Sequence, residues 1–174
     1  MLKVRVVPTL LWKQFGLVKG VGFNSWRRVG SVLPSIKVYN KREVDELILV
    51  DIVAHQSADD LDFDEIESYS EDCFVPLTVG GGLRRIDQVQ RLLNAGADKV
   101  AVNTAAYTHP EFITDIARKH GAQCVVASVD VISDPAGGWR CFSHAGQVDT
   151  GRDAVAWVKE LEERGREGRK NATE

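Results

Sequence analysis

Apolar, β-branched runs alternate along this chain with amphipathic stretches of helical period. Each apolar run is nearly continuous, as expected of a strand that is covered on both faces. Each stretch between them repeats its apolar positions every three to four residues, as a helix does. The alternation predicts a parallel α/β sheet built from about five strand–helix units. The predicted strands are 4–11, 46–52, 74–79, 99–103 and 123–131, and the predicted helices are about 31–43, 62–72, 86–95, 109–120 and 152–164.

Polar residues and glycines stand at the carboxyl ends of these predicted strands. They are Asp51, Gly80 to Gly82, Asn103 with Thr104, and Asp130. Ligands bind at this edge in open parallel sheets and in (β/α)₈ barrels. The run VGGGLRR (79–85) lacks the G-x-G-x-x-G spacing of a dinucleotide-binding turn. Three consecutive glycines are expected either where the chain makes a tight strand-to-helix turn or where a ligand approaches the backbone closely. Both explanations are open at this point.

Composition excludes several classes of function. The net charge is −3, from 22 basic and 25 acidic residues, so we expect no nucleic-acid partner. No apolar run reaches the length of a membrane span, and the first residues lack the apolar core of a signal peptide. The three cysteines form no C-x-x-C pair, which favours reduced thiols in the cytoplasm over a metal site. We therefore expect a cytoplasmic protein with neither a metal nor a cofactor.

Five motifs together resemble one enzyme family. They are VKG (18–20), DELILVDI (45–52), PLTVGGGLR (76–84), AGADKVAVNTAA (95–106) and SVD (128–130). With them, residues 1 to about 165 resemble the cyclase subunit of imidazole glycerol phosphate synthase. The resemblance implies a (β/α)₈ barrel and a lyase activity in histidine biosynthesis. Such subunits use ammonia from a glutaminase partner to convert a bis-phosphorylated ribonucleotide into imidazole glycerol phosphate and an aminoimidazole carboxamide ribotide.

The resemblance also implies a substrate site. Asp130 matches a catalytic aspartate at the end of the fifth strand, and Lys19 matches a catalytic lysine on a long loop after the first strand. Backbone amides and side chains of two neighbouring turns would hold one substrate phosphate, because amides are unobstructed where no Cβ intervenes. These phosphate-binding residues are Gly81, Gly82, Asn103 and Thr104. For Asp51, tuning of the site and structural pairing are both open.

Matching residues at the opposite end of the strands imply contact with a partner. Charged residues there would close an ammonia passage by pairing and open it by a swing of a side chain, and two further positions would face the glutaminase. The passage residues are Arg5, Glu46 and Lys99, and the partner-facing residues are Asp98 and Gln123. A fourth passage charge cannot be assigned to Glu167, because the sequence has diverged there.

The sequence departs from the family at residue 11. The family pairs two catalytic aspartates, at the ends of strands one and five, and Leu11 stands in the position of the first. Leucine carries no exchangeable proton, so we expect cyclisation in the histidine pathway to be severely impaired. The segments EVDEL (43–47) and SVDV (128–131) look more like a paralogous branch. That branch is encoded with surface-polysaccharide genes and is thought to use ammonia to make an acetamidino group on a sugar, which is the alternative function.

A second departure concerns length. The family's other phosphate site lies in strands seven and eight, and its chain continues beyond residue 165 into a sixth strand. Residues 166–174 carry no large apolar side chain. We therefore expect residues 1–165 to be the N-terminal part of a barrel, truncated after about five units, followed by a polar tail over 166–174. A non-catalytic fragment that keeps phosphate binding is a third possibility.

Overall fold

A mostly parallel sheet of seven strands is the main element of the computed structural model, which describes residues 4–13, 16–21, 24–54 and 61–171. Its hydrogen-bonded order is β3-β2-β1-β4-β5-β6-β7. Strand β1 pairs in parallel with β4, and β4 pairs in parallel with β5. The predicted α/β class is confirmed, and the sheet is consistent with a (β/α) barrel family. The strands are β1 (Thr9–Lys13), β2 (Gly16–Val21), β3 (Asn24–Gly30), β4 (Leu47–Asp51), β5 (Leu77–Gly80), β6 (Lys99–Val102) and β7 (Val125–Ala127).

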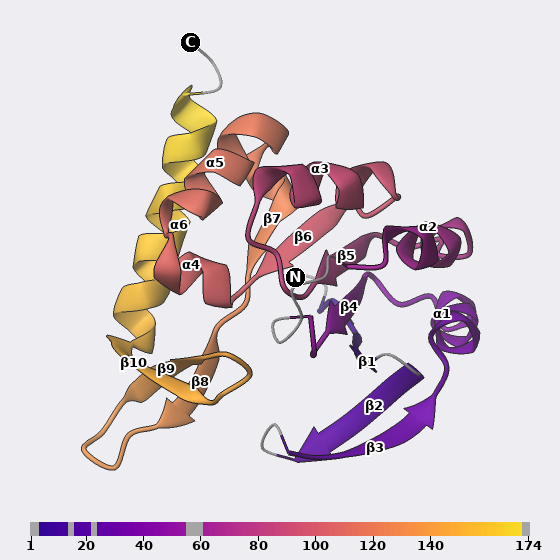
Figure 1. Cartoon of the computed structure of the whole chain (residues 1–174), viewed down its shortest axis with the longest axis horizontal. Helices are drawn as coiled ribbons and strands as arrows, with labels where there is room; N and C mark the ends of the chain where they lie inside the picture. Colours follow the sequence, from indigo (N-terminus) through magenta and orange to yellow (C-terminus); the bar gives the residue numbers. More distant parts are fainter. Residues whose placement is uncertain (1–3, 14–15, 22–23, 55–60, 172–174) are drawn as a thin grey trace. The chain divides into compact units, whose positions relative to one another are not determined.

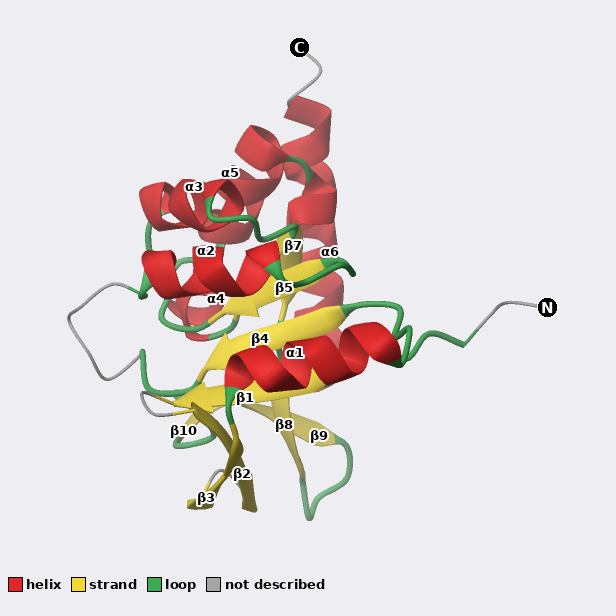
Figure 2. Cartoon of the chain, turned by 90° about the vertical axis from the view of Figure 1, so that its right-hand side faces the viewer, coloured by secondary structure: helices red, strands yellow, loops and turns green. Residues whose placement is uncertain are grey.

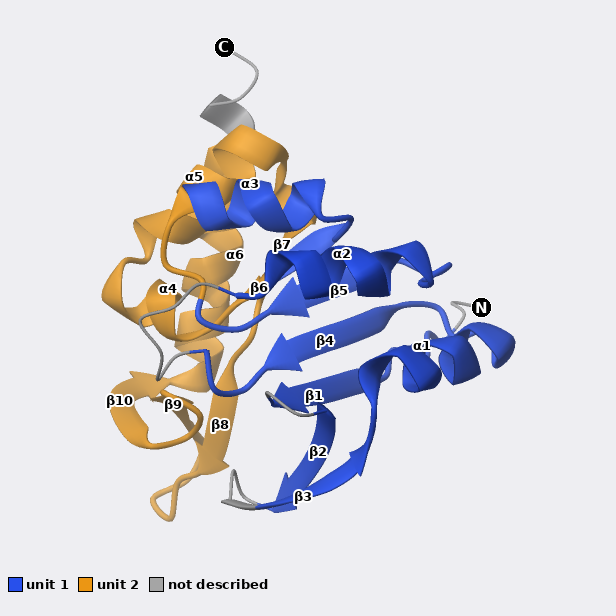
Figure 3. Ribbon diagram, turned by 45° about the vertical axis from the view of Figure 1, so that its right-hand side comes forward, with its two compact units in different colours: residues 1–82, 87–100 blue, residues 83–86, 101–174 orange. Residues whose placement is uncertain are grey.

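The chain divides into two compact units, and each is described by itself. Unit 1 comprises residues 1–82 and 87–100, and unit 2 comprises residues 83–86 and 101–174 (Figure 3).

Unit 1 owes its core to the strands that the apolar pattern predicts. Leu47 and Leu49 on β4 are fully buried. Helix α1 covers one face of the sheet beside this strand (Figure 2), and its residue Ile36 is fully buried. Helix α2 begins after Asp62, whose carboxylate accepts a hydrogen bond from the Glu65 N–H at 3.0 Å and so caps the helix. The helices are α1 (Val32–Lys41), α2 (Phe63–Glu71) and α3 (Ile86–Asn94), each within two residues of the predicted bounds.

Unit 2 combines helices with a small antiparallel sheet. Helix α6 runs alongside α4 and α5 (Figure 1). The helices are α4 (Thr104–Thr108), α5 (Glu111–His120), the short 3₁₀ helix η1 (Ala122–Cys124) and α6 (Ala154–Asn171). The second sheet has the order β10-β9-β8, with β8 (Asp130–Ser133), β9 (Trp139–Ser143) and β10 (Val148–Asp153).

Helix α6 extends further than its sequence predicts. The pattern predicts an end near residue 164 and an unstructured tail from residue 166, whereas the helix continues to Asn171; residues 172–174 lie outside the described residues. Gly168 explains part of the difference, since a Cβ there would lie 2.5 Å from the Thr114 carbonyl oxygen of α5, so glycine permits close helix packing. The exposed pair between Arg166 and Glu162, one turn apart at 2.6 Å, adds a small local contribution.

The strands that the sequence misses carry charged residues. The predicted long loop after the first strand contains β2 and β3, which pair as an antiparallel ribbon, and the hairpins of β8, β9 and β10 are likewise unpredicted. Charged side chains on these exposed strands break the apolar pattern that marks a buried strand. The first predicted strand also begins later than expected, at Thr9 instead of residue 4.

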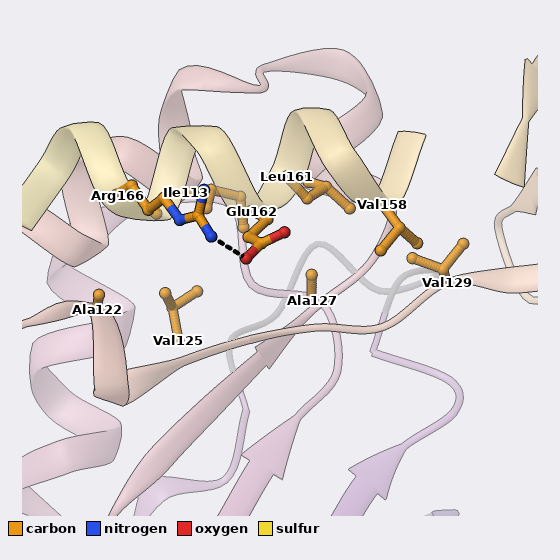
Figure 4. Close-up of a pocket in the computed structure, with 10 residues that line it drawn as sticks. Ile113, Ala122, Val125, Ala127, Val129, Val158, Leu161, Glu162 and Arg166 are labelled. Atoms are coloured by element: carbon orange, nitrogen blue, oxygen red, sulfur yellow. Dashed lines mark hydrogen bonds and ion pairs between the residues drawn. The ribbon is translucent and has the colours of Figure 1, made fainter. Parts of the chain in front are cut away.

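An apolar groove lies between β7 and α6 in unit 2 (Figure 4). Its volume is about 430 Å³, and an ion pair between Glu162 and Arg166 lies along it. In the described order β7 is the last strand of its sheet, so the groove accompanies a sheet edge. The lining residues are Ile113, Ala122, Val125, Ala127, Val129, Val158, Leu161, Glu162, Gly165 and Arg166.

Candidate functional site

The glycine turn after β5 packs closely against the end of β4. Gly82 has a φ of +62°, and a Cβ there would lie 2.8 Å from the Ala54 Cβ and 2.9 Å from the Ala54 carbonyl oxygen. Gly81 has a φ of +124° and faces the Asp51 carbonyl oxygen with no room for a side chain. Both the backbone conformation and the close approach of the 51–54 turn therefore require glycine. The turn explanation thus has a direct structural basis, and a phosphate would use the same bare amides.

Asp51 has a structural role in this turn. Its Oδ1 accepts hydrogen bonds from the backbone N–H groups of Val53 at 2.8 Å and Ala54 at 3.1 Å. The carboxylate therefore fixes the turn against which Gly81 and Gly82 pack.

In unit 2, Asn103, Thr104 and Asp130 form a connected polar cluster. The Asn103 side-chain Nδ2 donates a hydrogen bond to Asp130 Oδ2 at 2.9 Å. The Thr104 Oγ1 accepts a hydrogen bond from the backbone N–H of His144 at 3.1 Å. The Asn103 Oδ1 is buried without a hydrogen-bond partner. An unpartnered buried acceptor beside a carboxylate suits a ligand that carries an O–H or N–H donor.

The environment of Asp130 favours its protonated form. Burial raises the pKa of this carboxyl group, and the hydrogen bond from Asn103 opposes that rise by stabilising the carboxylate. A carboxyl group that holds its proton to higher pH can serve as a general acid, and its conjugate base can accept a proton later in the cycle. The catalytic role of Asp130 therefore stays a prediction with which the direction of its pKa shift agrees.

Lys19 lies on a strand and not on the predicted long loop. It occupies β2, where its side chain is exposed and its Cα pairs across the ribbon with that of Arg27. Like charges placed directly opposite each other in a ribbon are unfavourable unless an anion lies between them. The pair is thus compatible with a nearby anionic group.

The predicted ammonia-passage residues meet in unit 1. Glu46 is mostly buried, with 13% of its side chain exposed; its Oε1 pairs with the Arg5 guanidinium and its Oε2 with the Lys99 ammonium at 2.7 Å. Glu46 directly precedes β4 and Lys99 begins β6, so the cluster lies at the amino ends of these strands. One carboxylate thus bridges two cations, and the role of this cluster in passing ammonia stays a prediction.

The two predicted partner-facing residues lie in different units. Asp98 is exposed as a residue, but its Oδ2 accepts a hydrogen bond from the backbone N–H of Leu77 at 2.8 Å, so it also ties β5 to the start of β6. Gln123 is exposed in η1, with its amide against Gly121.

In the sequence, His144 has no visible partner and is expected to be a loop residue, and Ser143 is not singled out. The Ser143 Oγ lies 3.0 Å from the His144 Nδ1, and Ser143 is almost fully buried. His144 has a φ of +52° and Ala145 a φ of +55°, which non-glycine residues adopt rarely. Strained backbone of this kind often occurs at functional sites. The only sequence signal is a histidine before the Ala-Gly pair of a turn, which is weak.

The described residues contain neither a membrane-spanning helix nor a metal-binding cluster. No helix among them has the length and apolar character needed to cross a membrane. Within residues 4–13, 16–21, 24–54 and 61–171, no group of three or more His, Cys, Asp or Glu side chains could hold a metal ion.

The fold and these clusters define an α/β protein with polar residues at the carboxyl ends of parallel strands. The family model described as "Histidine biosynthesis protein" matches residues 5–168, so the chain belongs to this family. The chain is 45% identical, over 165 residues, to imidazole glycerol phosphate synthase subunit HisF of Gluconacetobacter diazotrophicus. The match covers 95% of this chain but 64% of the relative's length.

Proposed function

We infer that the chain performs ammonia-dependent cyclase and lyase chemistry of the imidazole glycerol phosphate synthase type, on a phosphorylated ribonucleotide. The observation that carries this function is Asp130, which is half-buried and accepts a hydrogen bond from Asn103. The predicted strand over 123–131 is divided into β7 and β8, and Asp130 begins β8 instead of ending the fifth strand. The similarity to a histidine-biosynthesis synthase supports this function rather than the amidination of a surface sugar.

Asn103 and Thr104, with the amides of Gly81 and Gly82, are the proposed phosphate-binding residues. Support comes from the Thr104 hydroxyl, which accepts one hydrogen bond and also has a proton that it can donate. Lys19, opposite Arg27, would add positive charge near an anionic substrate.

Calorimetry with the bis-phosphorylated ribonucleotide tests the substrate class. We expect saturable binding that weakens as salt is added, because charged groups contribute. Absence of binding to a folded chain would contradict the proposed substrate.

A glutaminase subunit is the proposed source of ammonia. The carboxylate of Glu46 between Arg5 and Lys99 would close the passage, while Asp98 and Gln123 would face the partner. Movement of either cation away from Glu46 would open it, and the exposed Arg5 side chain is the freer of the two.

Glu46→Gln is expected to uncouple the two ammonia sources. The amide cannot hold both cations, so glutamine-driven turnover should fall relative to turnover with ammonium salt. Because Glu46 is mostly buried but its partners are partly exposed, we also expect a loss of about 1 kcal/mol of stability, between the values for exposed and buried pairs. The test is the ratio of glutamine-driven turnover to turnover with ammonium salt, both measured with the glutaminase subunit present.

Glu162→Gln is the matched control. This variant removes the exposed ion pair of Glu162 with Arg166, which is distant in sequence from the passage residues. The ratio of glutamine-driven to ammonium-driven turnover should therefore stay unchanged. An unchanged ratio in Glu46→Gln as well would contradict the passage.

A further inference from the structure

We propose that His144 is the second acid–base group of the site and works with Asp130. This inference rests on the proposed function. It answers a question that Leu11 poses, since a chain with one catalytic carboxylate needs another group to exchange protons. A hydrogen bond within unit 2 ties the His144 backbone to Thr104, in the same polar cluster as Asp130.

Two hydrogen bonds fix His144. Its backbone N–H donates to the Thr104 Oγ1 at 3.1 Å, and its Nδ1 lies 3.0 Å from the Ser143 Oγ. Thr104 follows Asn103, whose side chain bonds to Asp130 at 2.9 Å. Consecutive residues at the start of α4 therefore bind Asp130 on one side and the His144 backbone on the other.

Strand pairing places the same residues near one another. Asp130 begins β8 and pairs across the sheet with Phe142 on β9. His144 follows two residues after Phe142, in the turn just beyond the end of β9. The pairing therefore brings this turn to the end of β8 at which Asp130 lies.

The hairpin that carries His144 is held firmly. Arg140 on β9 pairs with Asp134 at 2.9 Å and with Asp149 on β10 at 2.7 Å. The Thr150 hydroxyl donates to the Cys141 carbonyl oxygen at 2.8 Å. The turn that contains His144 is closed by the Gln147 N–H, which lies 3.1 Å from the Ser143 carbonyl oxygen and 3.3 Å from that of His144.

Other charged groups on the neighbouring strands have partners of their own. Arg140 is engaged by Asp134 and Asp149, and Arg152 on β10 is paired with Glu160 at 2.7 Å. The Asp153 carboxylate accepts a hydrogen bond from the Ala156 N–H at 2.9 Å. The Asp130 carboxylate accepts its side-chain hydrogen bond from a neutral group, Asn103.

The two groups can complete a balanced proton cycle. When the nitrogen of ammonia replaces a carbonyl oxygen, two protons move from nitrogen to oxygen. As the C–N bond forms, neutral His144 takes one proton from nitrogen through Nε2, and protonated Asp130 gives its proton to the oxygen. As the C–O bond then breaks, the Asp130 carboxylate takes the second proton from nitrogen, and protonated His144 gives its proton to the departing water. Both groups end as they began.

His144→Asn tests the role with little structural change. Asparagine can keep a hydrogen bond to Ser143 but cannot exchange protons near neutral pH, so kcat with ammonium salt should fall by roughly 10²-fold or more with little change in KM. In His144→Ala, added imidazole should restore part of kcat, which a purely structural role would not allow. His109→Ala, an exposed histidine, is the control and should behave as the original chain.

An NMR measurement keeps this inference separable from the proposed function. The imidazole resonances of His144 should move in Asp130→Asn, because the proposal places the two side chains at one site, whereas those of His109 should stay in place. If the original chain shows no turnover, the proposed function fails while this change still supports the pair. Unmoved His144 resonances, or undiminished kcat in His144→Asn, would overturn the role of His144.

Discussion

Asp130→Asn is expected to lower ammonia-dependent turnover by about 10²–10⁴-fold, the range typical of a lost acid–base group. Asparagine can still accept the hydrogen bond from Asn103, so the local geometry should persist. The same variant should be more stable at neutral pH. Turnover assays and thermal melting of the folded protein measure both effects.

The sign of the stability change follows from the pKa of Asp130. Burial raises that pKa in the folded chain, so the folded state binds a proton more tightly than the unfolded state. Stability therefore falls as the pH rises from the unfolded pKa through the raised folded pKa. Asparagine does not ionise, so Asp130→Asn should lose this part of the pH dependence and melt at a higher temperature near pH 7.

Asp115→Asn is the control for this variant. Asp115 is exposed and pairs with Arg118 at 3.2 Å, so its replacement should change stability by less than about 0.5 kcal/mol and leave turnover intact. If Asp130→Asn keeps its turnover within tenfold of the original chain, Asp130 is not the acid–base group.

Gly82→Ala is expected to destabilise the chain strongly and to weaken phosphate binding. A left-handed φ costs alanine about 1–2 kcal/mol, and overpacking against Ala54 adds about 1–3 kcal/mol. The displaced 51–54 turn would also disturb the amides proposed to bind phosphate. Urea unfolding gives the stability, and calorimetry with the phosphorylated ribonucleotide, at a temperature where the variant is folded, gives the affinity.

Gly151→Ala separates strain from close packing. Gly151 has a similar φ of +68°, but a Cβ there would meet no atom within 4 Å. Gly151→Ala should therefore lower the free energy of unfolding by only about 1–2 kcal/mol and should leave phosphate binding unchanged. Equal losses of stability in the two variants would show that contact with Ala54 is unimportant, and unchanged affinity in Gly82→Ala would remove the glycine turn from the phosphate site.

The buried part of the sheet is predictable because its residues face apolar neighbours on both sides. Leu47 and Leu49 on β4 and Leu77 on β5 fall in apolar runs that mark buried strands in the sequence. Helix α4 was missed because it spans five residues, too few to display a helical period.

The candidate site was predictable only in part, because its contacts join distant segments. The resemblance identifies Asn103 and Asp130, but their hydrogen bond spans 27 positions in sequence and depends on the pairing of the elements. His144 lies in a turn of an antiparallel hairpin, and no pattern of apolar residues places that turn beside Thr104. The passage cluster around Glu46 follows from the match to the family, whereas its bridging geometry comes from the structure.

The most direct test of the account uses ¹⁵N-labelled ammonium with the bis-phosphorylated ribonucleotide and the purified chain of 174 residues. We expect slow formation of imidazole glycerol phosphate that carries the label, and we expect the rate of its formation to fall strongly in Asp130→Asn. Absence of labelled product from a folded chain, or equal label in the product of both proteins, would contradict it.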